Sequence, residues 1–534
     1  MLAHYRLPLT WFDTSGMVTG FKVMQTTAKT LQSALGTSPA KDILPRKISP
    51  QVIWLAVILG FIGVFGITLS VLAGPQFLIA TLAAGIGVSI FAYPKVGLGL
   101  LVPALFLEAD IFDFDLPFGR FRTYHFLIAI LFARLLWDLL RQKITWRKTA
   151  LDWPLGLYLG INAVALYFAP DRGIALKILG LLVSLSMLYW VITNFVRTRE
   201  AFHRLVRILL NSSVIVALIG LAQVGIEWLN QKFDLALWHG PVMHSDILPY
   251  GRPYGTFVEP DWFGAFILVA LLVAAALFLS RTYRLRQVKT LLLVLLFTVV
   301  TVLAAVRGAW LGLLIGIAAL FVIDRVRRRD FNWGIALPAV IGLGVAIIIT
   351  ALVVPDVLAS LMDRIGSLFR WSAIAADPRF VTMQSGWDIW LQSPWIGFGP
   401  GAFKTLGVVP FQSDLQALIL GYEAFQTNAF LTVLIDTGLI GLSVTLLVAV
   451  QFVRTVGRGL RHASAIEYPV LVGLVAAALG LFVSYQVTAG LWLGLPWFLM
   501  AVIVAGANLV APERAPVTTR ADLIAAKVGE GSPS

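Results

Sequence analysis

The chain has 534 residues, of which 59% are hydrophobic and 13% are charged, and its mean hydropathy is +0.86. A soluble protein of this size would carry charged surfaces, but here apolar runs of about twenty residues recur, the length that crosses roughly 30 Å of hydrocarbon. We therefore predict an all-α fold, a polytopic transmembrane helical bundle with about 12–14 spans. Cysteine is absent, which excludes disulfides and thiolate metal sites.

The N-terminal segment, residues 1–50, is mostly polar, which does not fit a cleavable signal peptide. A stripe of apolar residues within it predicts an interfacial helix on the cytoplasmic face: Phe21, Met24, Ala28, Leu31 and Leu35. We predict a cytoplasmic N-terminal segment over 1–50, a transmembrane domain over 51–510 and a flexible cytoplasmic tail over 511–534.

Hydrophobic runs predict the transmembrane spans in chain order. The expected spans are 52–72, 76–93, 95–108, 124–140, 153–169, 174–196, 206–228, 260–280, 289–306, 308–323, 335–354, 427–452, 468–486 and 490–510. The span at 95–108 and the pair that meets at Arg307 have the weakest patterns.

Most of the 41 lysines and arginines fall in segments on one side of these spans. Cytoplasmic segments of membrane proteins carry such an excess, so both termini are predicted to be cytoplasmic. We interpret the basic runs as topology signals that contact anionic lipid head groups and not as nucleic-acid sites. An acidic turn at 108–115 faces outward, and a solvated loop explains it better than a divalent-cation site.

Two outward loops, 229–259 and 355–426, are long, and long loops usually carry function. Apolar residues repeat at helical spacing over 357–368 and 380–390 in the second loop, which predicts short amphipathic helices on the outer interface. A vestibule capped by such a loop suits a substrate with a lipid tail and a polar head.

Two arginines occur where the charge bias makes cations scarce. Arg307 separates two apolar spans, and Arg252 lies in the preceding outward loop. A guanidinium near a bilayer is costly unless it meets an anion, so the pair suggests a clamp for a phosphate-bearing lipid. The alternatives are a snorkelling or helix-capping role for Arg307 and an ordinary solvated loop position for Arg252.

Four segments carry a family resemblance. Arg252–Asp261 reads R-P-Y-G-T-F-V-E-P-D and resembles R-x-x-G-T-F-x-x-P-N, and Val306–Gly312 is similar to S-R-G-A-W-L-G. Arg379–Phe403 resembles an R…P-x-x-G-x-G-x-x-F element, and Asn428–Gly441 follows H-N-x-F-L…E-x-G-x-x-G. These are signatures of the O-antigen ligase and polymerase superfamily, and they occur here in family order.

The resemblance implies a multispanning glycosyltransferase at the outer face of the cytoplasmic membrane. Such enzymes transfer a glycan from undecaprenyl pyrophosphate to an acceptor sugar, inverting the anomeric centre without a metal or other cofactor. The acceptor is the lipid A core of lipopolysaccharide in ligases and another lipid-linked repeat in polymerases. The expected partners are therefore the lipid-linked donor, an acceptor glycan or glycolipid, membrane lipids and envelope-biosynthesis proteins, with no nucleic acid.

On this resemblance Arg252 and Arg307 match the family arginines that hold the pyrophosphate, because a guanidinium binds phosphate oxygens in a bidentate manner. Arg379 is a candidate third positive charge for the same site. It could instead pair structurally with Asp377 or Asp388.

The resemblance departs at Thr427, where ligases have a histidine that assists the acceptor hydroxyl. A threonine hydroxyl cannot act as a base near neutral pH. The candidate replacements are Glu423, Asp261 or Glu259, and His244. Asn428 begins the same motif and belongs to the candidate catalytic group, together with Thr427 itself.

Two other classes stay open. A transporter of a small anion such as bicarbonate should need ionisable sites near the midplane, whereas the charges here lie in loops and near span ends, including Arg134, Asp138 and Lys177. A non-catalytic partner in an envelope-assembly complex is the other alternative. The enzyme hypothesis accounts for more of the residues.

Overall fold

The structure is a computed structural model that describes residues 76–107, 113–116, 119–234, 251–327, 330–335, 355–366, 370, 377–407 and 428–511. The chain divides into two compact units, 1–85 and 86–534. Helix α3 (Gln76–Ala92) begins in the first unit, and its last residues belong to the second. The predicted spans 52–72 and 335–354 lie outside the described residues except for Ile335, and so do the interfacial helix near the N-terminus and the tail beyond 511.

The described part of the second unit is built from helices, with one small hairpin. The long helices are α5 (Thr123–Leu140), α7 (Arg172–Phe195), α8 (Arg199–Phe233), α9 (Pro260–Leu279), α11 (Arg307–Arg327), α18 (Ala429–His462) and α19 (Glu467–Ser484). The shorter elements are α4 (Pro94–Ala104), α6 (Asp152–Ala165), α10 (Gln287–Leu303), α20 (Gly494–Val510), α13 (Pro355–Gly366), α15 (Pro378–Gln392), α16 (Phe403–Leu406), and the 3-10 turns η2 (Leu166–Phe168), η3 (Arg281–Arg286) and η4 (Trp333–Ile335). Strands β1 (Asp113–Leu116) and β2 (Gly119–Arg122) pair antiparallel over part of the predicted acidic turn.

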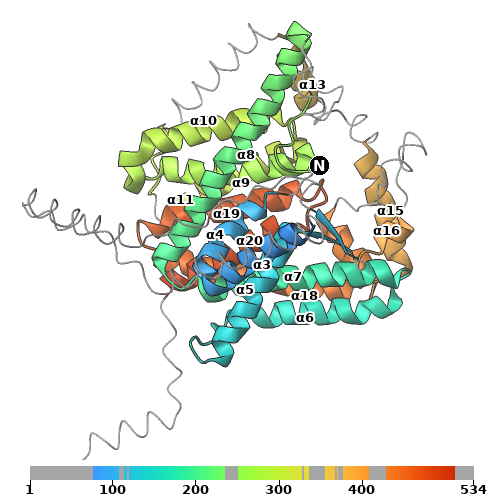
Figure 1. Ribbon diagram of the computed structural model, residues 1–534. Helices are drawn as coiled ribbons and strands as arrows, with labels where there is room; N and C mark the ends of the chain where they lie inside the picture. Colours follow the sequence, from blue (N-terminus) through green and yellow to red (C-terminus); the bar gives the residue numbers. More distant parts are fainter. Residues whose placement is uncertain are drawn as a thin grey trace, which may run out of the picture. The chain divides into compact units, whose positions relative to one another are not determined.

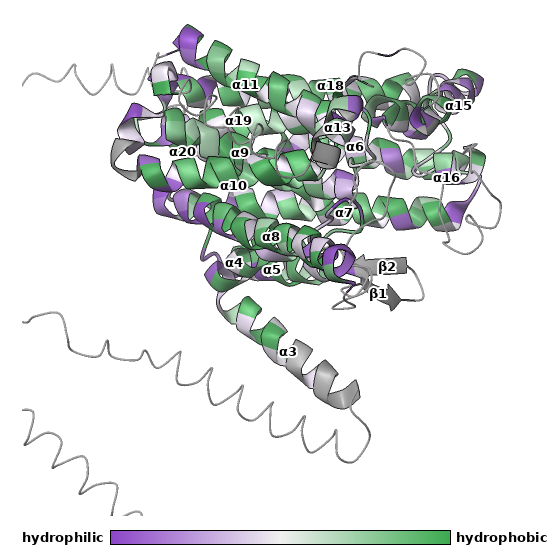
Figure 2. Cartoon of the chain, turned by 90° about the horizontal axis from the view of Figure 1, so that it is seen from above, coloured by the Kyte–Doolittle hydropathy of each residue, from purple (hydrophilic) through white to green (hydrophobic). Residues whose placement is uncertain are grey.

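The predicted polytopic helical bundle is confirmed. Within the described residues seven helices are long and apolar enough to cross a membrane, and α4, α10 and α20 are shorter apolar helices. Hydrophobic residues cover most of their length, as Figure 2 shows for α11, which turns hydrophilic at its end. The chain is thus a multi-pass membrane protein.

Two helices extend well beyond the spans predicted for them. Helix α8 starts at Arg199, where the Thr198 side chain accepts a hydrogen bond from the Ala201 amide. Helix α18 continues to His462 through a basic stretch. Hydropathy detects only the apolar part of a helix, whereas the backbone hydrogen bonding continues into its polar ends.

Helix α9 lies at the centre of one layer, with α10, α11 and α19 packed against it (Figure 1). Nearly every residue of α9 is buried, which explains why it is apolar on all sides. Helices α11 and α19 approach very closely, because a Cβ added to Gly312 would stand 2.4 Å from the Gly480 carbonyl oxygen. A second group consists of α6, α7, α18 and α20, which run side by side.

The bundle has two distinct ends. At one end the first residues of α8 and α19 meet through Arg199 and Glu467, and Ser280 after α9 pairs with Phe331 after α11. This is the end to which the sequence assigns the basic segments. At the opposite end lie the starts of α9, α11 and α18, together with the residues that precede α9 and α20.

Helices also form in the second long loop, 355–426. The predicted helices are confirmed over 357–366 by α13 and over 380–390 by α15, and residues 367–368 of the first lie outside the described residues. Helix α15 packs against α18, with Ile389 and Phe403 buried beside Leu434 and Ile435. Its opposite face exposes Phe380, Trp387 and Leu391. A position of these helices at a membrane interface remains a prediction.

Candidate anion-binding site

The segment before α9 is fixed by buried hydrogen bonds. Gln223 of α8 donates to the Gly255 carbonyl at 3.0 Å and accepts from the amides of Tyr254 and Gly255. Gly255 has φ +60°, and a Cβ there would meet Phe263 at 2.7 Å, so glycine is needed both for the turn and for the close contact. These contacts hold Arg252 in one place.

Arg252 is buried, with 8% of its surface exposed. Its Nε donates to the Ala304 carbonyl at 2.9 Å, and one terminal nitrogen pairs with Asp261 at 2.6 Å. The burial rules out the ordinary solvated loop position considered as an alternative. Arg252 thus joins the segment before α9 to the end of α10.

Asp261 lies in the first turn of α9 and is 8% exposed. One carboxylate oxygen accepts from Arg252, and the other accepts from Arg379 of α15. The neighbouring Trp262 donates its indole N–H to the Ala489 carbonyl at 2.7 Å, which ties the start of α9 to the segment before α20. Asp261 therefore connects two arginines that are 127 residues apart in the chain (379 − 252 = 127).

Arg307 is the first residue of α11, after the turn at 304–306. Ala305 in this turn has φ +52°, and Trp310 closes it by donating to the Thr301 carbonyl at 3.1 Å. The Arg307 guanidinium pairs with Asp377, and its side chain is only 15% exposed. Arg307 thus has a carboxylate partner, which a snorkelling arginine would not require.

Helix α15 brings the third arginine. Asp377 caps this helix, because its Oδ1 accepts from the Arg379 amide at 3.0 Å while its other oxygen pairs with Arg307. The Arg379 guanidinium reaches Asp261, and its side chain is 30% exposed. Of the two structural partners considered for Arg379, Asp377 contacts its backbone amide. No ion pair to Asp388 is present in the part of the chain that the structure describes.

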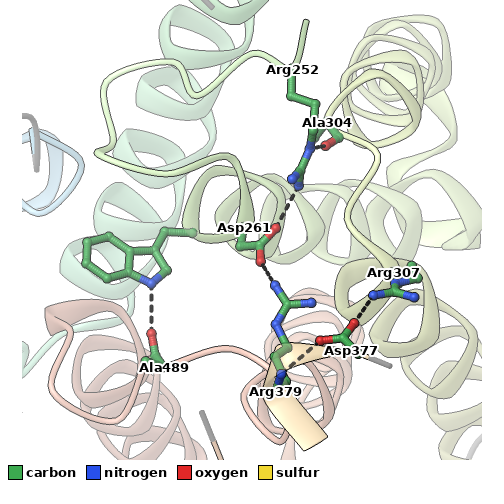
Figure 3. A network of polar contacts seen from close by, with 8 residues as sticks. Arg252, Asp261, Ala304, Arg307, Asp377, Arg379 and Ala489 are labelled. Carbon is green, nitrogen blue, oxygen red and sulfur yellow. Dashed lines mark hydrogen bonds and ion pairs between the residues drawn. The ribbon is translucent and has the colours of Figure 1, made fainter. Parts of the chain in front are cut away.

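The result is one network in which Arg252, Arg307 and Arg379 are held together by Asp261 and Asp377 (Figure 3). It draws on the segment before α9, on α9 itself and on the starts of α11 and α15. Three guanidinium groups face two aspartates, which leaves one positive charge among these five side chains. The network lies at the end of the bundle opposite the basic segments.

A further carboxyl group, Glu259, lies directly before α9. Burial raises the pKa of Glu259, and the nearby Asp261 carboxylate raises it further, whereas Arg379 and Arg252 act in the opposite direction. The Glu259 side chain makes no capping hydrogen bond to α9. It is partly exposed at the edge of the network.

The glycine-rich segment 394–403 packs across a kink in α18. The kink is at Gly438, with φ +62° and ψ −161°. The Phe398 and Gly399 amides donate to the carbonyls of Ile435 and Asp436, and the Asp436 side chain accepts from the Gly401 amide. Backbone amides of this segment thus bond to α18 and hold the residues that follow α15 against the kink.

Of the remaining candidate residues, Asn428 lies in the part of the chain that the structure describes. Asn428 caps α18 by accepting from the Leu431 amide at 3.0 Å, and it donates to the Gln486 carbonyl at 3.2 Å. It therefore starts α18 at the same end of the bundle as the arginine network. Glu423, Thr427 and His244 lie outside the described residues.

The sequence did not predict the roles of two residues of this site, Gln223 and Asp377. Gln223 was not singled out, although a buried amide in the middle of an apolar helix is a usable signal. Asp377 was considered only as a partner of Arg379, whereas its side chain pairs with Arg307. No local pattern could have identified that partner, because the two residues are 70 positions apart.

Comparison with known proteins supports the family resemblance. Residues 290–446 match the family described as O-Antigen ligase, which covers Arg307, Arg379 and Asn428. No curated protein matches the chain. The chain thus carries an O-antigen ligase family region, and the resemblance to the ligase and polymerase superfamily is confirmed for that region.

Proposed function

We propose that this protein transfers or polymerises a glycan, taking it from an undecaprenyl-pyrophosphate donor and passing it to an acceptor sugar at the outer face of the cytoplasmic membrane. The observation that carries the proposal is the convergence of Arg252, Arg307 and Arg379 at one end of a membrane-spanning bundle. The family match supports the same class of reaction.

The arginine network suits a diphosphate diester, which carries two negative charges. Guanidinium groups bind phosphate oxygens through paired N–H donors, and these bonds strengthen in a site that excludes water. As the bond between sugar and diphosphate breaks, negative charge grows on the leaving group. Fixed donors around that charge lower the barrier without a metal ion. In this proposal Arg252, Arg307 and Arg379 hold the leaving diphosphate.

The carboxylates of the network have a positioning role in this proposal. Both oxygens of Asp261 accept from arginines, so this residue orients Arg252 and Arg379 and is poorly placed to take a proton from an acceptor. Asn428 holds the start of α18 against Gln486. Glu423 and Thr427 remain candidates for contact with the acceptor on sequence grounds.

The charge distribution supports a site at the outer face of the membrane. The basic segments predict the cytoplasmic side, and the arginine network lies at the other end of the bundle. Both termini are then cytoplasmic, and the donor reaches the site from the membrane with its glycan outside the cell. The acceptor would be another lipid-linked repeat or the core of lipopolysaccharide.

Deletion of the gene in the native host tests the proposal, with surface glycans and lipid-linked intermediates analysed together. Accumulated unattached polymer identifies a ligase, and accumulated single lipid-bound repeats identify a polymerase. The native chain supplied in trans should restore the surface glycan, and a chain with Arg252→Ala and Arg307→Ala should not. An unchanged glycan profile in the deletion strain would contradict the proposal.

A further inference from the structure

A glycan transfer of this kind needs a group that takes the proton of the acceptor hydroxyl. The family position for that group is Thr427 here, and a threonine hydroxyl cannot perform the task near neutral pH. Glu423 and His244 lie outside the described residues, so the described carboxylates around the arginine network are the groups whose contacts can be compared. They are Asp261, Asp377 and Glu259.

The two aspartates are occupied. Asp261 has both oxygens on arginines, and Asp377 uses one oxygen for Arg307 and the other for the Arg379 amide. A proton could be taken by either one only at the cost of an ion pair or a helix cap. Such groups fix the geometry of the cations around them.

Glu259 differs from both aspartates. Among the described residues no ion pair includes its side chain, and the side chain does not cap α9 although it occupies the capping position. The residue is partly exposed, whereas Asp261 is buried. The backbone on either side is fixed by the Arg252 contacts and by α9.

We propose that Glu259 is the general base of the transfer proposed above, on which this inference rests. Its carboxylate takes the proton of the acceptor hydroxyl while the hydroxyl oxygen forms a bond to the anomeric carbon. The bond between that carbon and the diphosphate oxygen breaks, and its electron pair stays on the diphosphate, which the arginines hold. The proton leaves Glu259 for water after the product departs.

The electrostatic setting fits this role. The charged groups that face Glu259 are Asp261 of α9, Arg252 of the preceding segment and Arg379 of α15. Burial and Asp261 already raise the pKa of Glu259, and a bound diphosphate adds negative charge that raises it further. A base is most effective when its pKa approaches the working pH, so donor binding itself makes Glu259 a better base.

The test uses full-length protein in lipid nanodiscs, with Glu259→Gln as the variant. Transfer is measured with lipid-linked glycan extracted from the native host, and binding is measured with undecaprenyl diphosphate. Glu227→Gln is the matched control, because Glu227 is a buried carboxyl of α8 that bonds to Gln231, apart from the arginine network. Glu259→Asp serves as the conservative variant.

We expect Glu259→Gln to lower kcat by roughly 10²–10⁴-fold. Undecaprenyl diphosphate should bind at least as tightly as to the native protein, because the variant removes a negative charge. The native rate should rise with pH as Glu259 loses its proton, and this rise should be absent from the residual activity of Glu259→Gln. Glu259→Asp should recover part of the rate, and Glu227→Gln should match the native protein.

Two results overturn the assignment. If the Glu259→Gln protein keeps the native rate or the native pH dependence, Glu259 is not the base. Parallel loss of diphosphate binding and transfer would show a structural role instead. Failure of the proposed function gives a different result, because the native protein itself would then neither bind undecaprenyl diphosphate nor transfer glycan.

Discussion

Charged side chains are buried at both ends of the bundle, but they are balanced differently. At the basic end Glu467 pairs with Arg199 at 3.4 Å, and Asp138 pairs with Arg134 at 2.8 Å, so each of these two buried carboxylates has its own arginine. At the other end three arginines share two aspartates. The first arrangement pairs single carboxylates with single arginines, and the second joins three arginines through shared aspartates.

Net stability accounts for single ion pairs more readily than for a cluster of arginines. A buried ion pair contributes little net stability, because desolvation of both ions roughly cancels their attraction. An additional buried guanidinium is costly and is not explained by stability. Ionisable groups with perturbed pKa values and partly compensated charges are typical of functional sites. The end that holds Arg252, Arg307 and Arg379 is therefore the one to test by substitution.

Removal of one arginine at each end of the bundle should give the largest difference in activity. Arg307→Ala should lower glycan transfer by about 10²-fold or more, because a donor to the leaving diphosphate is lost. Arg199→Ala should leave transfer within about twofold of native, because this exposed side chain pairs only with Glu467 among the described carboxylates. Transfer rates and membrane insertion of both variants are measured side by side. Equal losses at the two ends would remove the distinction.

Removal of one carboxylate at each end should change the melting temperature, and the two variants should differ in how far undecaprenyl diphosphate raises it. Asp261→Asn leaves Arg252 and Arg379 together without their shared anion, so the melting temperature of the unliganded protein should fall. Added undecaprenyl diphosphate should then raise it by more than in the native protein, because the ligand supplies the missing charge. Glu467→Gln should also lower the melting temperature, but without a larger response to the ligand. A response of the same size in both variants would contradict the interpretation.

The smallest effects are expected in the segment before α18. If Glu259 is the base within the network, Glu423→Gln and Thr427→Ala should each change the transfer rate by less than about tenfold, because neither group then takes the proton. Parallel rate measurements on the two variants decide this. A loss in Glu423→Gln alone, as large as that in Arg307→Ala, would move the base to Glu423.

The sequence predicts the parts of this fold that depend on local patterns. Hydropathy alone locates helices such as α9 and α19, and the cost of an isolated guanidinium in an apolar setting draws attention to Arg307. The pattern of four motifs places Arg252, Arg307 and Arg379 in one family context. These predictions need only neighbouring residues or a known order of motifs.

The contacts that build the site could not be predicted in the same way. Asp377 meets Arg307, and the glycine segment 394–403 meets the kink at Gly438, because helices far apart in the chain pack together. The kink itself has a local requirement, since a Cβ at Gly438 would stand 2.3 Å from the Trp395 carbonyl carbon. The partner that imposes this requirement appears only in three dimensions.

The glycine contact between α11 and α19 has a mechanical consequence for Arg307. Where Gly312 meets Gly480, backbone touches backbone, and no side chain lies between the helices to change its rotamer. Arg307 stands at the start of α11, about one and a half turns before this contact. The backbone at the start of α11 is therefore positioned by the close packing of one helix on another.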